Sequence, residues 1–170
     1  LNNLSLDQNQ LLGEISSEIG NIYSLRGINL STNELTGTIP LEIGALDSLV
    51  ELLLGENQLS GSIPTGIWNL QLLEALFLDT NQLTGELSEE IGNLPNLYAL
   101  SLFGNQLEGI IPDDICNLSI LEEINLWDNN FCPPYPQCLS NNSLGFQDTT
   151  YCTGFTWQES VIPTPSAGAF

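Results

Sequence analysis

Apolar residues recur at fixed places within a repeated unit of this chain, and polar residues fill the places between them. The stretch from Leu25 to Leu46 reads LRGINLSTNELTGTIPLEIGAL, and nearly the same pattern returns from Leu49 to Leu70. One asparagine and one glycine return every 24 residues, at Asn9, Asn33, Asn57, Asn81, Asn105 and Asn129 and at Gly13, Gly37, Gly61, Gly85 and Gly109. A fixed period in this range is typical of a solenoid, in which each unit is covered by its neighbours.

The order of residues within a unit predicts its local structure. In L-x-x-L-x-L, inward leucines alternate with outward residues at the period of a strand, so stacked units predict a parallel sheet with rungs roughly 4.8 Å apart. The asparagine follows this strand at an inward bend, where its amide can pair with backbone groups that would otherwise be buried alone. Glycine tolerates positive φ at the next corner, and Pro40, Pro64 and Pro112 fix φ where the chain turns back.

The unit L-x-x-L-x-L-x-x-N-x-L-x-G-x-I-P-x-x-I-G-x-L resembles the plant-type class of extracellular leucine-rich repeats, which is known from receptor-kinase ectodomains and polygalacturonase-inhibitor-like proteins. The resemblance covers residues 1–131, in six units. It implies an α/β solenoid, a right-handed superhelix with a parallel concave β-sheet and short 3-10 or irregular convex segments. It also implies a second short strand at the T-G-x-I positions, and binding rather than catalysis as the usual role.

The repeats divide the chain into three expected segments. Residues 1–131 are six leucine-rich repeats, residues 132–155 are a cysteine-containing carboxy-terminal cap, and residues 156–170 are a Pro-, Ser- and Thr-containing tail or the start of a linker. Leu1 falls inside a repeat without an amino-terminal cap, so we expect the chain to be a piece of a longer protein. No run of about 18 apolar residues occurs, so the chain is expected to contain no transmembrane segment.

The four cysteines all lie near the end of the chain, which favours a disulfide cap and an extracellular or cell-surface location for a secreted protein. Four cysteines allow three pairings. Continuing the repeat register places Cys138 near the position one rung above Cys116, which favours Cys116 with Cys138 and Cys132 with Cys152. A zinc site is the alternative, but the chain has no histidine and the C-x5-C spacing suits zinc poorly.

Four N-x-S/T triplets are candidate N-glycosylation sites if a eukaryote secretes the chain, and they start at Asn3, Asn29, Asn117 and Asn141. The alternative is chance, because repeats rich in asparagine and serine generate such triplets readily. Glycans on Asn3 and Asn29 would lie on the concave sheet. They would direct a ligand toward the later rungs.

The chain carries 21 acidic residues against a single basic residue, Arg26, so its net charge is -20. This charge argues against nucleic-acid binding, which needs lysine and arginine at the phosphates. Three interpretations remain: a solvated acidic surface suited to salt, a basic partner, or bridging by calcium. The candidate calcium ligands occupy the same two convex positions in adjacent units, and are Glu89, Glu90, Asp113 and Asp114. The alternative for these four acids is that they favour the start of a short helix.

The outward positions of the later strands combine aromatic and acidic side chains. Phe103 and Trp127 share one column on adjacent rungs, and Leu53, Phe77 and Tyr98 are expected close by. Clustered exposed aromatic residues flanked by acids suit a cationic or amphipathic ligand, although they could also fill the sheet surface or contact another copy. The predicted ligand-binding residues are Glu51, Leu53, Glu74, Phe77, Asp79, Tyr98, Phe103, Glu122, Trp127 and Asp128.

Catalysis is not expected, because the chain has no histidine and no lysine and so lacks the commonest general base. We predict a non-catalytic extracellular recognition module that binds a protein or peptide ligand, basic in character, on its concave face. The alternative is a structural component of an extracellular array, appendage or cell-surface layer that self-associates through calcium bridges. Apart from calcium, no cofactor is expected.

A third hypothesis is ice binding through a flat ladder of paired hydroxyl groups, at Thr36 and Thr38 in one unit and at Ser60 and Ser62 in the next. The later units do not continue this ladder, because Glu86 and Ile110 occupy the second position of the pair.

Overall fold

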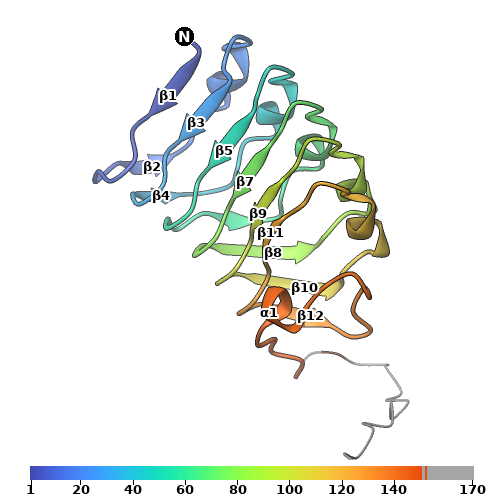
Figure 1. Ribbon diagram of the computed structural model, residues 1–170. Helices are drawn as coiled ribbons and strands as arrows, with labels where there is room; N and C mark the ends of the chain where they lie inside the picture. Colours follow the sequence, from blue (N-terminus) through green and yellow to red (C-terminus); the bar gives the residue numbers. More distant parts are fainter. Residues whose placement is uncertain (151, 153–170) are drawn as a thin grey trace, which may run out of the picture.

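The computed structural model describes residues 1–150 and 152, which wind through stacked rungs (Figure 1). One short strand from each of six rungs enters a parallel sheet of order β1-β3-β5-β7-β9-β11. These strands are β1 (Asn3–Ser5), β3 (Gly27–Asn29), β5 (Glu51–Leu53), β7 (Ala75–Phe77), β9 (Ala99–Ser101) and β11 (Glu123–Asn125). Their register follows the 24-residue repeat, since Leu52 lies beside Leu76 and Leu76 beside Leu100. The predicted parallel sheet is confirmed.

A second set of strands follows the asparagine bends, as the T-G-x-I positions predict. It forms a two-stranded sheet and a four-stranded sheet of order β12-β10-β8-β6. The strands are β2 (Leu12–Glu14), β4 (Glu34–Thr36), β6 (Ser60–Gly61), β8 (Gln82–Glu86), β10 (Gln106–Ile110) and β12 (Asn130–Cys132). Here Gln106 lies beside Thr84, not beside Gln82, so each strand is shifted by two residues relative to the repeat.

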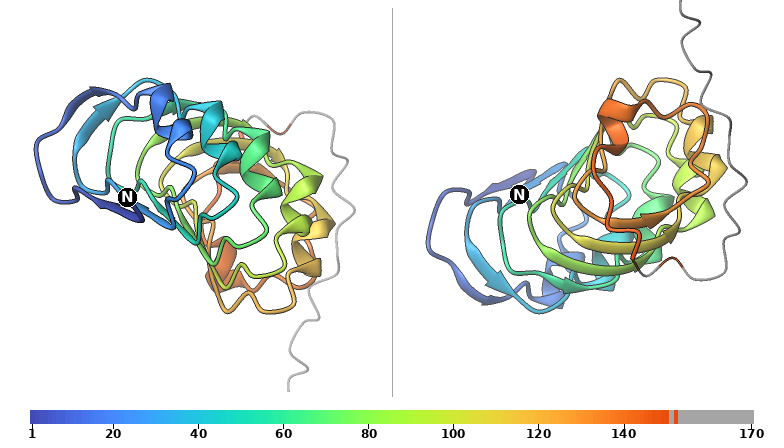
Figure 2. Two further views of the ribbon diagram at one scale, coloured as in Figure 1. Left: turned by 90° about the horizontal axis from the view of Figure 1, so that it is seen from above. Right: turned by 90° about the horizontal axis from the view of Figure 1, so that it is seen from below.

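Short 3-10 helices line the convex side, away from the sheet that contains β1 and β11 (Figure 2). They are η1 (Ser17–Asn21), η2 (Leu41–Ala45), η3 (Thr65–Asn69), η4 (Glu89–Asn93) and η5 (Asp113–Asn117). Proline with extended backbone precedes η2, η3 and η5, whereas the Ser16 and Ser88 hydroxyls accept backbone hydrogen bonds at the start of η1 and η4. Among the described residues, no helix has the length and apolar character needed to cross a membrane.

The inward leucines and isoleucines of all rungs form one continuous core. Residues at the same position of successive units are buried together, for example Leu52, Leu76 and Leu100. Each buried aliphatic side chain contributes about 1.5–3 kcal/mol relative to its exposed state. Because every inward side chain contacts the rungs above and below, a rung gains this stabilisation only inside the stack.

The asparagine of each rung joins it to its neighbour through a side-chain amide. The Asn81 Nδ2 donates to the backbone oxygens of Leu54 (3.1 Å), Leu78 (3.1 Å) and Asp79 (3.1 Å), and its Oδ1 accepts from the Leu59 N–H (2.9 Å). The same pattern recurs at the asparagines of neighbouring rungs. In the described part of the chain, no buried side-chain nitrogen or oxygen lacks a hydrogen-bond partner.

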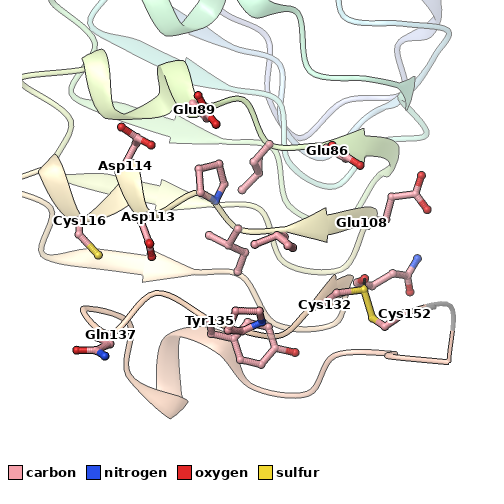
Figure 3. A pocket seen from close by; sticks show the side chains of 17 residues that line it. Glu86, Glu89, Glu108, Asp113, Asp114, Cys116, Cys132, Tyr135, Gln137 and Cys152 are labelled. Atoms are coloured by element: carbon pink, nitrogen blue, oxygen red, sulfur yellow. Dashed lines mark hydrogen bonds between the residues drawn. A yellow bond between two sulfur atoms is a disulfide. The ribbon is translucent and has the colours of Figure 1, made fainter. Parts of the chain in front are cut away.

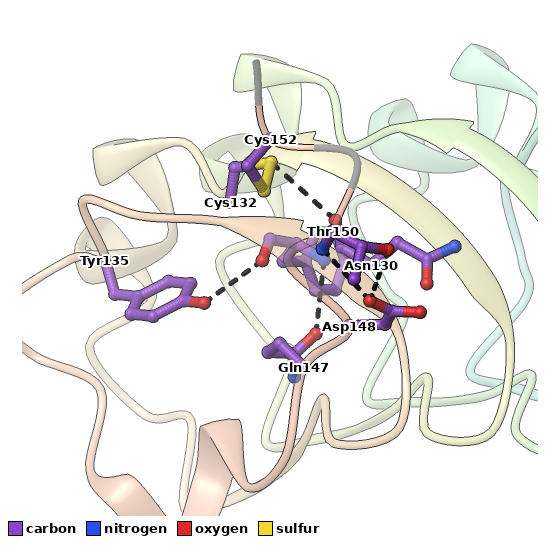
Figure 4. The surroundings of a disulfide bond; sticks show 8 residues. Asn130, Cys132, Tyr135, Gln147, Asp148, Thr150 and Cys152 are labelled. Carbon is purple, nitrogen blue, oxygen red and sulfur yellow. Dashed lines mark hydrogen bonds between the residues drawn. A yellow bond between two sulfur atoms is a disulfide. The ribbon is translucent and has the colours of Figure 1, made fainter. Parts of the chain in front are cut away.

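The segment after β12 closes the last rung with main-chain and side-chain hydrogen bonds. Leu126 N–H donates to the Ser143 carbonyl (2.8 Å), at the short helix α1 (Asn141–Leu144). The Gln147 Oε1 accepts from Phe131 N–H (3.2 Å) and its Nε2 donates to the Leu126 carbonyl (2.9 Å), so a glutamine repeats the role of the rung asparagine (Figure 4). The repeat pattern does not predict this role of Gln147, because Gln147 follows Asn129 by 18 residues instead of 24.

Two disulfides hold this closing segment. Cys116 is bonded to Cys138 and Cys132 to Cys152, which is the pairing that the repeat register favours. Tyr135 lies between Cys132 and Cys138 in the sequence. Its hydroxyl donates to the Phe131 carbonyl (3.0 Å; Figure 4).

Trp68 occupies a convex position that glycine holds in neighbouring rungs. A Cβ added at Gly44 would lie 2.7 Å from the Gly66 Cα, and one at Gly92 would lie 2.7 Å from the Asp114 carbonyl oxygen, so little space separates these helices. The Trp68 side chain is nevertheless only 1% exposed. The repeat pattern does not predict this core residue, because Trp68 interrupts the column of glycines.

We predict that Asn81→Ala lowers the free energy of unfolding by about 2–4 kcal/mol, because it leaves the Leu59 N–H and several carbonyls buried without a partner. Asn9 is the matched control, since it is exposed and its amide donates to carbonyls of its own rung only. Asn9→Ala should cost about 1 kcal/mol or less. Urea denaturation followed by circular dichroism measures both, and equal losses would contradict the importance of the amide between rungs.

We also predict that Trp68→Ala destabilises the protein by about 3–5 kcal/mol, because it opens a large cavity behind η3. Trp127→Ala removes the same side chain at a position that is 40% exposed. It should change stability by less than about 1 kcal/mol. Urea denaturation measures the free energy of unfolding of both variants. If Trp68→Ala lowers it as little as Trp127→Ala does, the surrounding side chains fill the cavity and the prediction is contradicted.

Candidate functional site

The concave face carries a stacked aromatic pair at its last two rungs. The Phe103 and Trp127 ring centroids are 4.7 Å apart and the ring planes differ by 5°. Both residues follow a strand of the concave sheet, and the Gly104 N–H donates to the Trp127 carbonyl (3.1 Å), which continues the ladder between their rungs. Phe103 is half-buried and Trp127 is exposed. The predicted shared column is therefore a stacked pair whose outer ring, that of Trp127, is 40% exposed.

Gly145 bounds the stack on the side of the closing segment. A Cβ at Gly145 would collide with the Trp127 Cβ, and the Gly145 φ of 52° lies in the region that favours glycine. The Asp128 N–H, next to Trp127, donates to the Phe146 carbonyl (2.8 Å). The closing segment therefore holds the backbone on both sides of Trp127 in place. The sequence alone did not indicate that Gly145 leaves room for Trp127.

Asp79 lies in the same column on the other side of Phe103, and the Thr80 N–H donates to the Phe103 carbonyl (2.8 Å). The Asp79 carboxylate occupies the space over Gly55. A Cβ added at Gly55 would lie 2.9 Å from an Asp79 oxygen. Burial raises the pKa of Asp79 above 3.8, and the nearby Glu56 carboxylate raises it further, whereas hydrogen bonding by its own backbone and by Ser101 opposes the change. A half-buried carboxylate beside an aromatic stack suits a cationic group.

The remaining predicted residues are two central apolar residues, one tyrosine and four acids. Leu53 and Phe77 lie side by side in the middle of the sheet and are half-buried. Tyr98, by contrast, precedes β9 while Phe103 follows it, so their Cα atoms are roughly 16 Å apart along an extended strand. The strand therefore separates Tyr98 from Phe103, and the part of Tyr98 in ligand binding stays a prediction. The exposed acids at the ends of the strands are Glu51, Glu74, Glu122 and Asp128.

The four candidate calcium ligands lie in the first turns of two adjacent helices, with Glu89 and Glu90 in η4 and Asp113 and Asp114 in η5. Across residues 1–150 and 152, no three His, Cys, Asp or Glu side chains form a group that could hold a metal ion. The structure therefore does not assemble these carboxylates into a calcium site. Their place at helix starts matches the alternative interpretation.

The candidate glycosylation sites fall on both faces. Asn3 and Asn29 lie in β1 and β3 of the concave sheet, where the Asn29 Oδ1 accepts from the Ser31 N–H (3.1 Å). Asn117 ends η5 and Asn141 begins α1, and both are exposed.

The hydroxyl ladder expected at the second set of strands is not aligned between adjacent units. Because of the two-residue shift, Thr38 lies beside Ser60, Ser60 beside Gln82, and Thr36 beside Glu14. The hydroxyl pairs of adjacent units are therefore out of register, which corrects the expected alignment.

Four consecutive units, residues 24–46, 48–70, 72–94 and 96–118, match the Leucine Rich Repeat family. No curated protein sequence matches the chain. Among solved structures, the chain is similar to the ectodomain of the plant membrane receptor kinase GASSHO1/SCHENGEN3 from Arabidopsis thaliana in complex with CASPARIAN STRIP INTEGRITY FACTOR 2. The identity is 39% and the TM-score 0.75, over 76% of this chain and 16% of that chain.

Two further similar structures have different roles. One is the plant peptide hormone receptor RGFR1 in complex with RGF2, at 35% identity and TM-score 0.66, over 77% of this chain and 25% of that chain. The other is a plant ice-binding protein, at 32% identity and TM-score 0.66, over 77% of this chain and 42% of that chain. The chain thus spans less than half the length of each. Because the family's four matched repeats make up more than half of this sequence, the chain belongs to the leucine-rich repeat family.

Proposed function

We propose that this chain is a non-catalytic extracellular recognition module, and that it binds a protein or peptide ligand on the concave face of its later rungs. The observation that carries the proposal is the Phe103–Trp127 stack beside Asp79. It offers an aromatic platform with an adjacent carboxylate, and tryptophan is among the residues enriched at interface hot spots.

Two of the similar structures support a binding role. The GASSHO1/SCHENGEN3 ectodomain is in complex with CASPARIAN STRIP INTEGRITY FACTOR 2, and RGFR1 is a peptide hormone receptor in complex with RGF2. Two disulfides in the closing segment are consistent with an oxidising, extracellular environment. The leucine-rich repeat ectodomains that this chain resembles are non-catalytic.

The charge of the concave face defines the ligand class. Asp128 is exposed next to Trp127, whereas Glu74 and Glu122 are exposed at the opposite end of the strands, and Arg26 is the only basic residue in the chain. An arginine or lysine side chain of the ligand can contact the exposed part of the Trp127 ring while its charge is balanced by Asp128. We therefore propose a ligand with at least one basic residue next to an apolar one.

We predict that Trp127→Ala and Phe103→Ala each weaken binding by about tenfold or more, since each removes half of the stack. The probe is a peptide selected on the wild-type protein from a displayed random library, and its dissociation constant is measured by biolayer interferometry. Tyr23→Ala is the matched control, because Tyr23 is an exposed aromatic residue outside the concave sheet. If all three variants bind selected peptides like the wild type, the concave platform is not the binding site.

We predict opposite effects of pH on stability and on binding through Asp79. Since its pKa is raised in the folded state, Asp79 stabilises the fold below 3.8, and this contribution is lost as the pH rises through its folded pKa. Asp79→Asn should therefore gain stability over the wild type as pH rises.

A basic peptide should conversely bind the wild type less tightly as pH falls through the same range, and Asp79→Asn should lack this step. Urea denaturation and peptide titration across this range test both, and pH-independent differences would contradict the assignment.

A further inference from the structure

A groove lies between the second set of strands and the closing segment, outside the concave sheet. Its volume is about 1200 Å³, and its walls come from the ends of β8 and β10, the start of η5 and the loop after β12 (Figure 3). We name it the cap groove. Its lining shares no residue with the predicted concave ligand-binding set.

Five carboxylates surround the cap groove. Glu86 and Glu108 lie on one side and Asp113 and Asp114 on the other, with Glu89 above them in the view of Figure 3. They come from two successive rungs, and the one basic residue of the chain is in the second rung. The groove thus gathers negative charge that no basic side chain of this protein neutralises there.

The floor of the cap groove contains an apolar side chain at a position that is polar in the earlier units. Ile110 is 44% exposed, and the equivalent positions of the preceding units hold Glu14, Thr38, Ser62 and Glu86. Ile111, Pro112, Pro134 and Tyr135 extend this apolar lining. A partner that covers Ile110 would remove its apolar surface from water, which favours binding.

The walls of the cap groove are held in place. Cys116 and Cys132, which line it, are bonded to Cys138 and to Cys152. The Tyr135 hydroxyl donates to the Phe131 carbonyl, which fixes the ring at the groove. A ligand therefore meets a largely ordered site, and little ordering free energy is lost on binding.

The arrangement of charges selects among the occupants. A divalent cation needs several carboxylates on one point, but among the described residues no three acids form such a group. A second copy would bring another net charge of -20, and residues 153–170 contain no lysine or arginine. A chain segment with spaced positive charges fits carboxylates on opposite sides of an apolar floor.

We propose that the cap groove is a second binding site, and that it takes a basic peptide segment in which cationic side chains alternate with apolar ones. The cationic side chains contact the Glu86–Glu108 side and the Asp113–Asp114 side, and the apolar side chains cover Ile110. This site is separate from the concave platform, so a single chain can hold two partners or two parts of one partner.

The test uses a short fluorescein-labelled peptide in which arginine alternates with leucine, titrated against the full chain by fluorescence anisotropy. Glu108→Gln/Asp113→Asn should weaken binding about tenfold, since it removes one acid from each side. The control Glu14→Gln/Glu42→Gln removes the same charge on early rungs, outside the groove lining, and should change affinity less than about twofold. Ile110→Thr, which restores the polar residue of earlier units, should weaken binding about fivefold without any change in charge.

Three results would overturn the proposal. Equal losses in the two charge variants would mean that the peptide responds only to net charge. Loss of binding in Trp127→Ala, with the groove variants unchanged, would place the peptide on the concave platform instead. A dimer seen by light scattering that Ile110→Thr abolishes would identify the occupant as a second copy. Failure of the concave platform leaves the groove result unaffected, because the two sets of variants share no residue.

Discussion

The amide of the rung asparagine is the interaction on which the rest of the structure depends. Each rung must turn inward after its strand, and this turn buries carbonyls and an N–H group that no regular ladder satisfies. Asn81 supplies three donor contacts and one acceptor contact at once, and they join two rungs. Because the amide fixes where each strand ends, it also fixes which outward residues form a column on the concave face.

Much of this architecture follows from the sequence because the repeat is regular. The leucine column predicts the concave sheet, and the resemblance to plant-type leucine-rich repeats implies the second strands and the short convex helices. The exceptions break the period or the column: Gln147 closes the ladder after a shorter interval, and Trp68 fills a position where glycine is expected. Whether an out-of-register residue is accommodated depends on neighbours from other rungs, which a one-dimensional pattern does not reveal.

The candidate sites show the same division. The Phe103–Trp127 pair is predictable from a shared column, because the concave strands follow the repeat register. Tyr98 lies at the other end of β9 from Phe103, a separation that a shared column does not indicate. The cap groove was not predicted at all, because the second strands shift by two residues and bring Glu86 beside Glu108. Only the folded register reveals that pairing.

Burial of the ladder increases along the chain, from an exposed Asn9 to Asn129, which is 2% exposed. The deeply buried end of this ladder lies next to the disulfides, so the amide hydrogens of the last rungs should exchange slowly. The Phe103–Trp127 platform and the cap groove both lie at this end. Each site can therefore keep its shape during local fluctuations elsewhere in the described part of the chain.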